Sequence, residues 1–338
     1  MENFKNKTLL ITGGTGSFGN AVLNRFISED FKEIRIFSRD EKKQDDMRHQ
    51  YSNSKLNFII GDIRDFNSIN NAMRGVDYVF NAAALKQVPS CEFYPMQAVQ
   101  TNILGSENVL ESAVINKVQR VVVLSTDKAA YPVNTMGMTK AIMEKLAISK
   151  SRDHRIKEYG GVISTTRYGN VMCSRGSIIP LFIDQIKKGK PLTITVPEMT
   201  RYMMSLDDAV DLVLFAFKNA RPGDLFVQKA PAATILTLAQ ALKELFNANN
   251  EIVTIGARHG EKMYETLCTS EEMTKAEDMG DFFRVPADLR DLNYSNYVET
   301  FGHRLDVPDY NSDNAKLLSI SEMKELLLSL DYVREQLK

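Results

Sequence analysis

Short apolar runs rich in β-branched residues alternate with helical patterns over the first half of the chain. Strands are predicted at residues 8–12, 33–38, 56–61, 78–82 and 120–125, and helices near 20–28, 41–50, 67–73 and 98–114. This alternation is typical of a parallel sheet with helices on both faces. Ligands of such sheets bind beyond the carboxyl ends of the strands, so the residues that follow each strand are the candidates for chemistry.

After about residue 168 the pattern changes. Helices are predicted at 176–188, at 205–219 with Ser205 as its N-cap, and at 321–337, and extended segments at 192–195 and 225–228. The predicted fold class is α/β, a doubly wound parallel sheet of the Rossmann type with a smaller α/β substrate domain. We expect residues 1–168 to form the sheet domain, with 203–228 returning to it, and residues 169–202 and 229–338 to form the smaller domain.

Composition and charge narrow the function classes. The 338 residues are 43% hydrophobic and 25% charged, with a net charge of −1, which argues against disorder and against nucleic-acid or anionic-membrane partners. The three cysteines and four histidines show no metal-ligand spacing. No apolar signal core begins the chain and no apolar run of about 18 residues follows, so a cytoplasmic protein without membrane insertion is expected.

A glycine-rich turn follows the first predicted strand and precedes a helix. Gly13, Gly16 and Gly19 are spaced as G-x-x-G-x-x-G. Glycine allows a tight turn and close backbone approach to a pyrophosphate, and the helix N-terminus attracts the anion. A bound dinucleotide is therefore predicted. Its expected contacts in this turn are Gly13, Thr15, Gly16, Ser17, Phe18 and Gly19.

The tip of the second predicted strand indicates which dinucleotide binds. NAD sites usually carry an acidic residue there for the ribose hydroxyls. Here Ser38 and Arg39 offer a hydroxyl and a guanidinium, which suit a 2′-phosphate, and Lys43 is a further cation nearby. NADP is therefore favoured, while Asp40 keeps NAD open.

The third and fourth predicted strands supply further cofactor contacts. Asp62 and Ile63 follow the third strand, where a short carboxylate can accept the adenine amine. Ala82 closes the fourth strand, and its small side chain leaves room for the cofactor.

Several motifs in this order resemble the extended short-chain dehydrogenase/reductase superfamily, and within it a narrower group. They are 84–89 (ALKQVP), 125–129 (STDKA), 167–171 (RYGNV), 174–177 (SRGS) and 258–262 (RHGEK). The set resembles the inverting UDP-N-acetylglucosamine 4,6-dehydratases of bacterial polysaccharide biosynthesis. The capsule and O-antigen members that begin the UDP-L-FucNAc pathway are the most similar. The resemblance implies a homo-oligomer, such as a hexamer.

One position departs from the superfamily pattern. The superfamily carries a Tyr-x-x-x-Lys pair, whereas this chain has Met136 and Lys140. The capsule-type subgroup is similar in carrying this Met-x-x-x-Lys form. Methionine transfers no proton, so the base for oxidation at carbon 4 stays open. Tyr131 cannot be placed from the sequence.

The resemblance also implies how the reaction proceeds. Oxidation of carbon 4 acidifies the carbon-5 hydrogen, water is lost across carbons 5 and 6, and the hydride then returns to carbon 6. By resemblance, Asp127 is the acid for the leaving hydroxyl and Lys128 the base at carbon 5. Burial and the nearby cations Lys86 and Lys140 are expected to lower the pKa of Lys128. Retaining relatives have Asp-Glu where this chain has Asp-Lys.

Further residues are assigned by resemblance. Lys140 is expected to contact the nicotinamide ribose, and Lys86 both cofactor and substrate. The expected contacts to UDP-N-acetylglucosamine are Lys86, Thr126, Asn170, Val171, Arg175, Ile178, Arg258 and Glu261. One polar stretch resembles a segment that covers the substrate, but an ordinary surface loop explains it equally well. It contains Arg284, Arg290, Tyr294 and Tyr297.

Three alternatives remain at this stage. A retaining dehydratase is disfavoured by Asp127-Lys128, and a UDP-sugar C4 epimerase by the missing tyrosine. A catalytically dead NADP-binding subunit is disfavoured because Asp127, Lys128 and Lys140 are all present. No metal is predicted.

Overall fold

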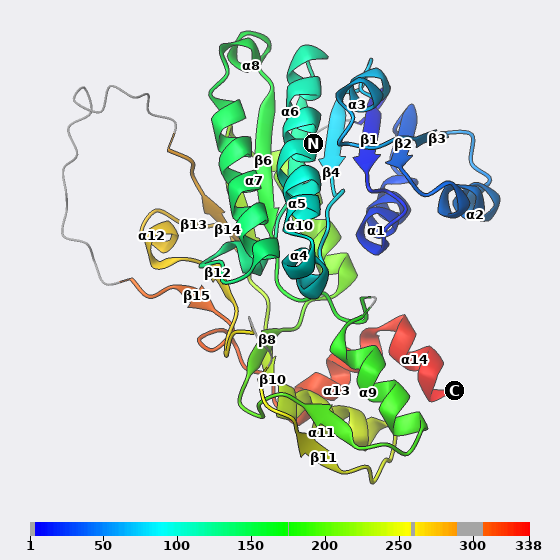
Figure 1. The fold of residues 1–338 in the computed structure, drawn as a ribbon, viewed down its shortest axis with the longest axis vertical. Coiled ribbons are helices and arrows are strands. Elements are labelled where there is room, and N and C mark those ends of the chain that lie inside the picture. The colour runs from blue at the N-terminus through cyan, green and yellow to red at the C-terminus, as the bar shows by residue number, and fades with distance from the viewer. Residues whose placement is uncertain (1–3, 175, 258–260, 289–306) are drawn as a thin grey trace.

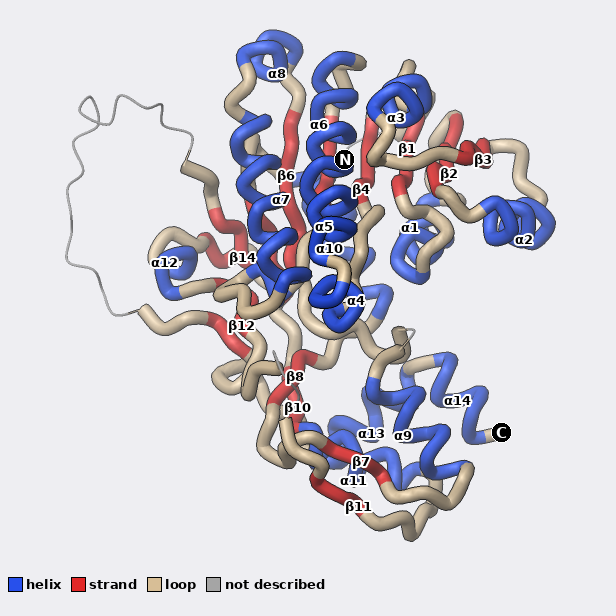
Figure 2. The backbone as a smooth tube through the Cα atoms, viewed as in Figure 1, coloured by secondary structure: helices blue, strands red, loops and turns tan. Residues whose placement is uncertain are grey.

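The computed structural model describes residues 4–174, 176–257, 261–288 and 307–338. A larger body is built around one sheet, and a smaller body lies beyond the carboxyl ends of its strands (Figure 1). Within the described ranges the large sheet has nine strands in the order β13-β14-β9-β6-β5-β4-β1-β2-β3. Figure 2 shows these strands at the centre of the larger body with helices around them.

The strands from β3 through β9 run parallel, and β14 and β13 continue the sheet antiparallel. Their bounds are β1 Thr8–Thr12, β2 Glu33–Ser38, β3 Leu56–Ile60, β4 Tyr78–Asn81, β5 Arg120–Leu124, β6 Val162–Arg167, β9 Leu225–Gln228, β13 Glu277–Asp278 and β14 Phe282–Val285. The predicted doubly wound parallel sheet is confirmed.

Each face of the sheet has its own hydrophobic core. Leu9 and Ile11 of β1 join the core under α1, α2 and α10, whereas Leu10 joins the core under α3, α6 and α7. Because side chains alternate along a strand, a strand covered on both faces is apolar throughout. The helices are α1 Ser17–Phe26, α2 Glu41–Tyr51, α3 Phe66–Ala72, α6 Ser106–Ile115, α7 Thr135–Ser151, α8 His154–Tyr159 and α10 Leu206–Asn219.

The smaller body has a third core, formed mainly by α9, α11, α13 and α14. Its helices are α9 Ile178–Lys187, α11 Ile235–Leu245, α13 Ile320–Ser329 and α14 Asp331–Leu337, and α12 Ser270–Met273 lies beside the large sheet. Three two-stranded sheets complete the described part. They pair β7 Leu192–Ile194 with β11 Ile252–Thr254, β8 Thr200–Tyr202 with β10 Ala232–Thr234, and β12 Thr266–Cys268 with β15 Tyr310–Asn311.

Three features of the fold differ from the sequence-based expectation. The C-terminal helix is broken at Leu330, which is extended (φ −84°, ψ 122°) and precedes Asp331 in the first turn of α14, where an acidic side chain is favourable. The helix expected over 98–114 is not uniform, because α4 Val88–Phe93 and α5 Pro95–Ala98 lead into a π-helix, η1 Val99–Gly105, before α6. The strands β13 and β14 belong to the large sheet, although they lie within 229–338.

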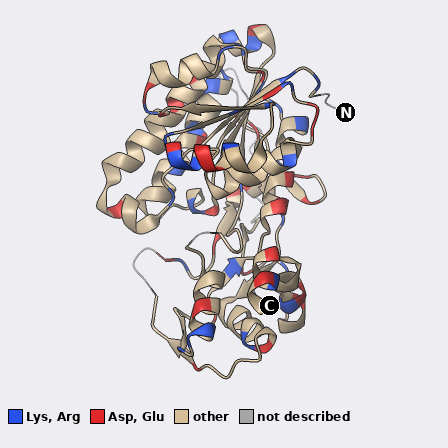
Figure 3. Ribbon diagram, turned by 90° about the vertical axis from the view of Figure 1, so that its right-hand side faces the viewer, with Lys and Arg blue, Asp and Glu red and all other residues tan. Residues whose placement is uncertain are grey.

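Charged residues of both signs are interspersed over the two bodies (Figure 3), in line with the net charge of −1. Among the described residues, no helix combines the length and the apolar character needed to cross a bilayer.

A buried ion network joins β6, α7 and α12. Arg167, which is 2% exposed, bonds Glu144 of α7 at 2.6 Å and Glu272 of α12 at 2.7 Å. It also donates to the carbonyl of Leu267 over 2.8 Å. The network ties α12 and β12 to the end of the parallel sheet.

Replacing Arg167 tests this network. Arg167→Ala leaves the buried carboxylate of Glu144 and the partly buried carboxylate of Glu272 without their cation. We therefore expect a loss of about 3–5 kcal/mol of unfolding free energy in urea titrations. The control is Arg25→Ala, since Arg25 pairs with Asp211 on the surface, with both side chains nearly half exposed. That variant should lose about 1 kcal/mol or less. Equal losses in the two variants would contradict a structural role for the buried network.

Candidate active site

The candidate site lies beyond the carboxyl ends of β1, β4, β5 and β6. In Figure 1 the arrowheads of β1 and β4 point toward the smaller body. The strands that follow β1 in the chain extend the sheet on one side through β2 and β3, whereas β4, β5 and β6 extend it on the other. Such a switch point between β1 and β4 opens a crevice for a ligand.

The glycine turn after β1 has no room for side chains. Gly13 has φ +65°, and a Cβ there would lie 2.8 Å from Cα of Ala83. A Cβ on Gly19 would lie 2.5 Å from Cα of Gly14. Gly16 is the N-cap of α1 without a side-chain cap, so the first amides of α1 are left for another acceptor. This backbone cradle fits a dinucleotide pyrophosphate.

Other predicted residues of this turn are also at the crevice. Thr15 Oγ1 lies 2.7 Å from Ser38 Oγ, which joins the turn to the tip of β2. Ser17 opens α1. The ring of Phe18 packs against those of Phe80 and Tyr168, with centroids 5.6 and 5.1 Å apart.

At the tip of β2, the acidic residue is already engaged. Asp40 caps α2 by accepting from the amide of Lys43, and its Oδ2 lies 2.9 Å from Lys43 Nζ. The Lys43 side-chain hydrogen bond holds the pKa of Asp40 below its usual value. Arg39 is half exposed, with Nη1 3.7 Å from Asp62. The tip therefore presents a partly free guanidinium and an occupied carboxylate.

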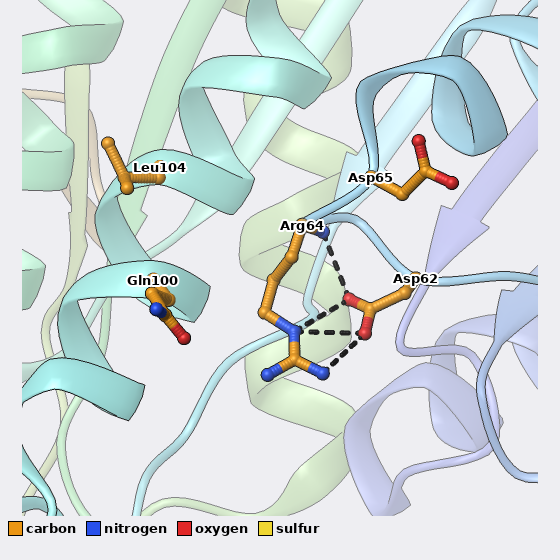
Figure 4. A pocket seen from close by; sticks show the side chains of 5 residues that line it. All are labelled: Asp62, Arg64, Asp65, Gln100 and Leu104. Atoms are coloured by element: carbon orange, nitrogen blue, oxygen red, sulfur yellow. Dashed lines mark hydrogen bonds and ion pairs between the residues drawn. The ribbon is translucent and has the colours of Figure 1, made fainter.

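A cavity of about 480 Å³ lies beside the end of β3. It is lined by Asp62, Arg64, Asp65, Gln100 and Leu104 (Figure 4). Arg64 donates to both oxygens of Asp62 over 2.6–3.1 Å, so the carboxylate expected to meet the adenine amine is shared with a cation. Ile63 is 4% exposed and packs in the core, whereas Ala82 is only half-buried at the end of β4.

The predicted acid–base pair follows β5 directly. Asp127 and Lys128 begin a short 3₁₀ turn, η2 Asp127–Ala129. Asp127 is 1% exposed, and its Oδ1 accepts from Thr126 Oγ1 over 2.8 Å and from Lys128 Nζ over 3.1 Å. Asp127 Oδ2 is buried without a hydrogen-bond partner. One carboxylate oxygen is thus anchored, and the other is left for a further donor.

A second carboxylate, which the sequence analysis missed, meets the same ammonium. Glu265 precedes β12 and is 4% exposed, and its Oε1 lies 3.3 Å from Lys128 Nζ. Arg201 of β8 lies 4.0 Å from the same oxygen. No local spacing relates Glu265 to Lys128, so only the tertiary fold reveals the contact.

The charge state of Lys128 differs from the expectation. Burial by itself lowers the pKa of this lysine, but Asp127 and Glu265 outweigh it and raise the pKa above its usual value. The cations that oppose them are Arg201 and Lys262, rather than Lys86 or Lys140. The expected lowering is therefore wrong, and Lys128 is held in its charged form.

The lysine with a lowered pKa is Lys140. It is 5% exposed, donates to the carbonyl of Leu124 over 2.7 Å, and burial lowers its pKa to about 8. Met136, one turn earlier on α7, is 4% exposed and packs with Cys91 and Ala98. The position of the superfamily's tyrosine is therefore occupied by a side chain of a small apolar cluster.

Tyr131 does not replace the missing tyrosine in this arrangement. It has φ +45° and is half exposed. Its hydroxyl accepts from the amide of Ser270 over 3.2 Å, at the start of α12.

The expected substrate contacts are only partly brought together. Lys86 is exposed over much of its surface, but the protein atoms around its ammonium remove part of the hydration and lower its pKa. Asn170 has a buried Oδ1 without a partner, and the neighbouring Val171 bridges to Met204. Ile178 opens α9, and Glu261 is exposed.

Some predicted residues lie outside the described residues or elsewhere in the fold. Arg175, Arg258, Arg290, Tyr294 and Tyr297 are outside the described residues. Arg284 is buried on β14 and paired with Asp224 at 2.7 Å and with Glu277, so it belongs to the sheet rather than to a covering segment. In the described part of the chain, no group of three or more potential ligands could hold a metal ion.

Comparisons with known proteins place this architecture in a family. A family described as polysaccharide biosynthesis protein matches residues 9–287, and one described as polysaccharide biosynthesis protein C-terminal matches residues 288–334. Proteins named UDP-glucose 4-epimerase are similar over 99% of both chains. That of Rickettsia canadensis (strain McKiel) is 63% identical over 340 residues, and that of Rickettsia prowazekii (strain Madrid E) is 62% identical over 340 residues.

Solved structures agree with this placement. Pen from Bacillus thuringiensis is 37% identical, with a TM-score of 0.86, over 97% of this chain and 99% of that one. A dTDP-glucose 4,6-dehydratase from Streptomyces venezuelae, 21% identical, shares the fold with a TM-score of 0.67 over 76% of this chain and 86% of that one. The chain therefore belongs to the polysaccharide biosynthesis protein family, a group of extended short-chain dehydrogenase/reductases.

Proposed function

We propose that this protein is an NADP-dependent, inverting 4,6-dehydratase of UDP-N-acetylglucosamine. The observation that carries the proposal is the pair of buried Asp127 and partly buried Lys128 at the end of β5, on the same sheet edge as the glycine cradle. Its product is UDP-2-acetamido-2,6-dideoxy-β-L-arabino-hex-4-ulose, the first intermediate toward UDP-L-FucNAc for a capsule or O-antigen. We also keep a cytoplasmic homo-oligomer as a prediction.

The reaction breaks the C5–H and C6–O bonds and releases one water. When bound, the nicotinamide supplies redox chemistry by accepting hydride from carbon 4 and returning it to carbon 6. What the protein's own residues must provide is a proton acceptor at carbon 5, a proton donor to the 6-hydroxyl, and a proton for carbon 5 on the opposite face. Asp127 and Lys128 are the pair proposed for this proton transfer.

The charge arrangement favours a particular division of roles. Because Lys128 is held charged, it suits proton donation to the departing 6-hydroxyl. The unpartnered Oδ2 of Asp127 suits acceptance of the carbon-5 proton. This assignment exchanges the two roles implied by the family resemblance. Lys140, with its pKa lowered to about 8, is the titratable neighbour of Met136 on α7 and is proposed for the carbon-4 oxidation.

NADP is proposed over NAD because of the β2 tip. Asp40 is engaged by Lys43, so it is not free to accept from ribose hydroxyls. Arg39 and Ser38 offer donors suited to a 2′-phosphate. The cradle of Gly13 to Gly19, the start of α1 and the cavity beside Asp62 would hold the rest of the dinucleotide.

A UDP-glucose 4-epimerase is the second candidate, favoured by the names of the Rickettsia relatives. An epimerase needs proton exchange only at the 4-hydroxyl, for which the superfamily uses the tyrosine that Met136 replaces here. That reaction does not need a second acid–base pair such as Asp127 and Lys128. A catalytically dead NADP-binding subunit is a third reading, and Asp127-Lys128 argues against it.

The function is tested by incubating the protein and NADP⁺ separately with UDP-N-acetylglucosamine and with UDP-glucose. We expect the first substrate to lose one water and give a 4-keto sugar, measured by mass spectrometry and NMR, without accumulation of NADPH. Conversion of UDP-glucose to UDP-galactose, with no dehydrated product, would establish the epimerase instead. No turnover of either substrate would favour the dead subunit.

Cofactor choice is tested with Arg39→Asp. We expect this variant to weaken NADP⁺ binding by about tenfold or more while changing NAD⁺ binding little, because the 2′-phosphate loses a charge-assisted partner. Isothermal titration with each dinucleotide measures the difference. Lys42→Asp, an exposed neighbour paired with Asp46, serves as a control for general surface charge. Equal weakening of both cofactors by Arg39→Asp would contradict the NADP assignment.

Lys128 and Met136 form a matched pair of tests. Lys128→Ala should reduce dehydration by roughly 10²-fold or more, the usual scale for a proton-transferring group, and should leave cofactor binding intact. Met136→Ala should cost far less, since a thioether transfers no proton and the change opens only a small apolar cavity. Initial rates of keto-sugar formation provide the measurement. Full turnover by Lys128→Ala would rule out the proposed acid–base pair.

A further inference from the structure

Glu265 contacts the acid–base pair although it lies far from that pair in the sequence. It follows the segment that contains Lys262 and immediately precedes β12. Its side chain is 4% exposed, and Oε2 is buried without a hydrogen-bond partner. A buried carboxylate is costly unless a cation faces it. The cation at the shortest distance is the ammonium of Lys128, at 3.3 Å.

The backbone of Glu265 is held rigidly. Its amide donates to Ser312 Oγ over 2.9 Å, and the amide of Ser312 donates back to the Glu265 carbonyl over 2.8 Å. Ser312, which is fully buried, also bonds both the hydroxyl and the carbonyl of Thr200, at 2.8 and 3.2 Å. The carboxylate is therefore presented to Lys128 by a clamp between β8 and the segment around β15.

The groups around Lys128 have both signs. Asp127 bonds the ammonium at 3.1 Å from its own turn, and Arg201 of β8 lies 4.0 Å from the Glu265 oxygen that faces Lys128. Lys262 directs its ammonium to the carbonyl of Ala130 over 2.8 Å, and it also acts electrostatically on Lys128. With Asp127 alone, Lys128 would face one carboxylate and two cations. Glu265 balances these charges.

We infer that Glu265 is a positioning residue of this site, which fixes the ammonium of Lys128 opposite Asp127 and keeps it protonated at the start of each cycle. The inference rests on the proposed function, because it assigns Lys128 a proton to deliver. Glu265 acts through Lys128 rather than on the sugar. This positioning role also explains why a segment from the C-terminal half of the chain lies at the end of β5.

The direct test is the titration of Lys128 in the full chain. It is followed by carbon NMR of protein that carries a carbon label in its lysine side chains. The Lys128 signal is identified by its loss in Lys128→Arg. In Glu265→Gln the titration should move to lower pH by about one unit or more, because a facing negative charge is lost. Glu265→Asp keeps the charge and should restore part of the shift. Glu272→Gln, the same change at a carboxylate that faces Arg167, should leave the Lys128 titration unchanged.

The pH profile of keto-sugar formation provides the second readout. Its alkaline limb should move to lower pH in Glu265→Gln by the same amount as the NMR titration, whereas a merely structural role would lower the rate at every pH. If wild-type protein forms the keto sugar but Glu265→Gln keeps both the titration and the profile, the inference is wrong and the proposed function stands. If wild-type protein forms no keto sugar, the proposed function falls and this inference falls with it.

Discussion

The pairing of one partly buried ammonium with two buried carboxylates is the interaction on which this site depends. Lys128 lies 3.1 Å from Asp127 and 3.3 Å from Glu265, and both carboxylates are almost fully buried. Removing an ion from water costs several kcal/mol unless opposite charge and hydrogen bonds replace the lost hydration. The charges are therefore stable only if their distances are kept, which places strict demands on the surrounding fold.

The fold meets these demands from two directions. The parallel strand β5 ends at Leu124, and the short turn η2 then directs Asp127 and Lys128 to the sheet edge. From the other side, the clamp around Ser312 holds Glu265. The Arg167 network ties β12, the strand that follows Glu265, to the same sheet edge through the Leu267 carbonyl. The acid–base pair is thus completed by chain segments that are far apart in the sequence.

Local patterns predicted much of this fold. The bounds of β1, β2 and β9 agree with the expected strands, since these apolar runs are short, β-branched and clearly bounded, and the glycine turn is required by close backbone contacts at Gly13 and Gly19. Features set by long-range contacts were missed. Glu265 has no local motif, and the pKa of Lys128 depends on that distant carboxylate. Arg284 is buried by the pairing of β14 with β9, which lies far from it in the sequence. The break at Leu330 was missed because both halves of the segment have helical periodicity.

The proposed dehydration requires that this protein transfers protons at carbon 5 of its sugar. The most direct measurement is the position of deuterium after the reaction of UDP-N-acetylglucosamine in heavy water, determined by NMR of the product. We expect deuterium on carbon 5 of a 6-deoxy-4-keto sugar with inverted configuration at that carbon. A product without solvent deuterium at carbon 5, or one that differs from the substrate only in its configuration at carbon 4, would contradict it.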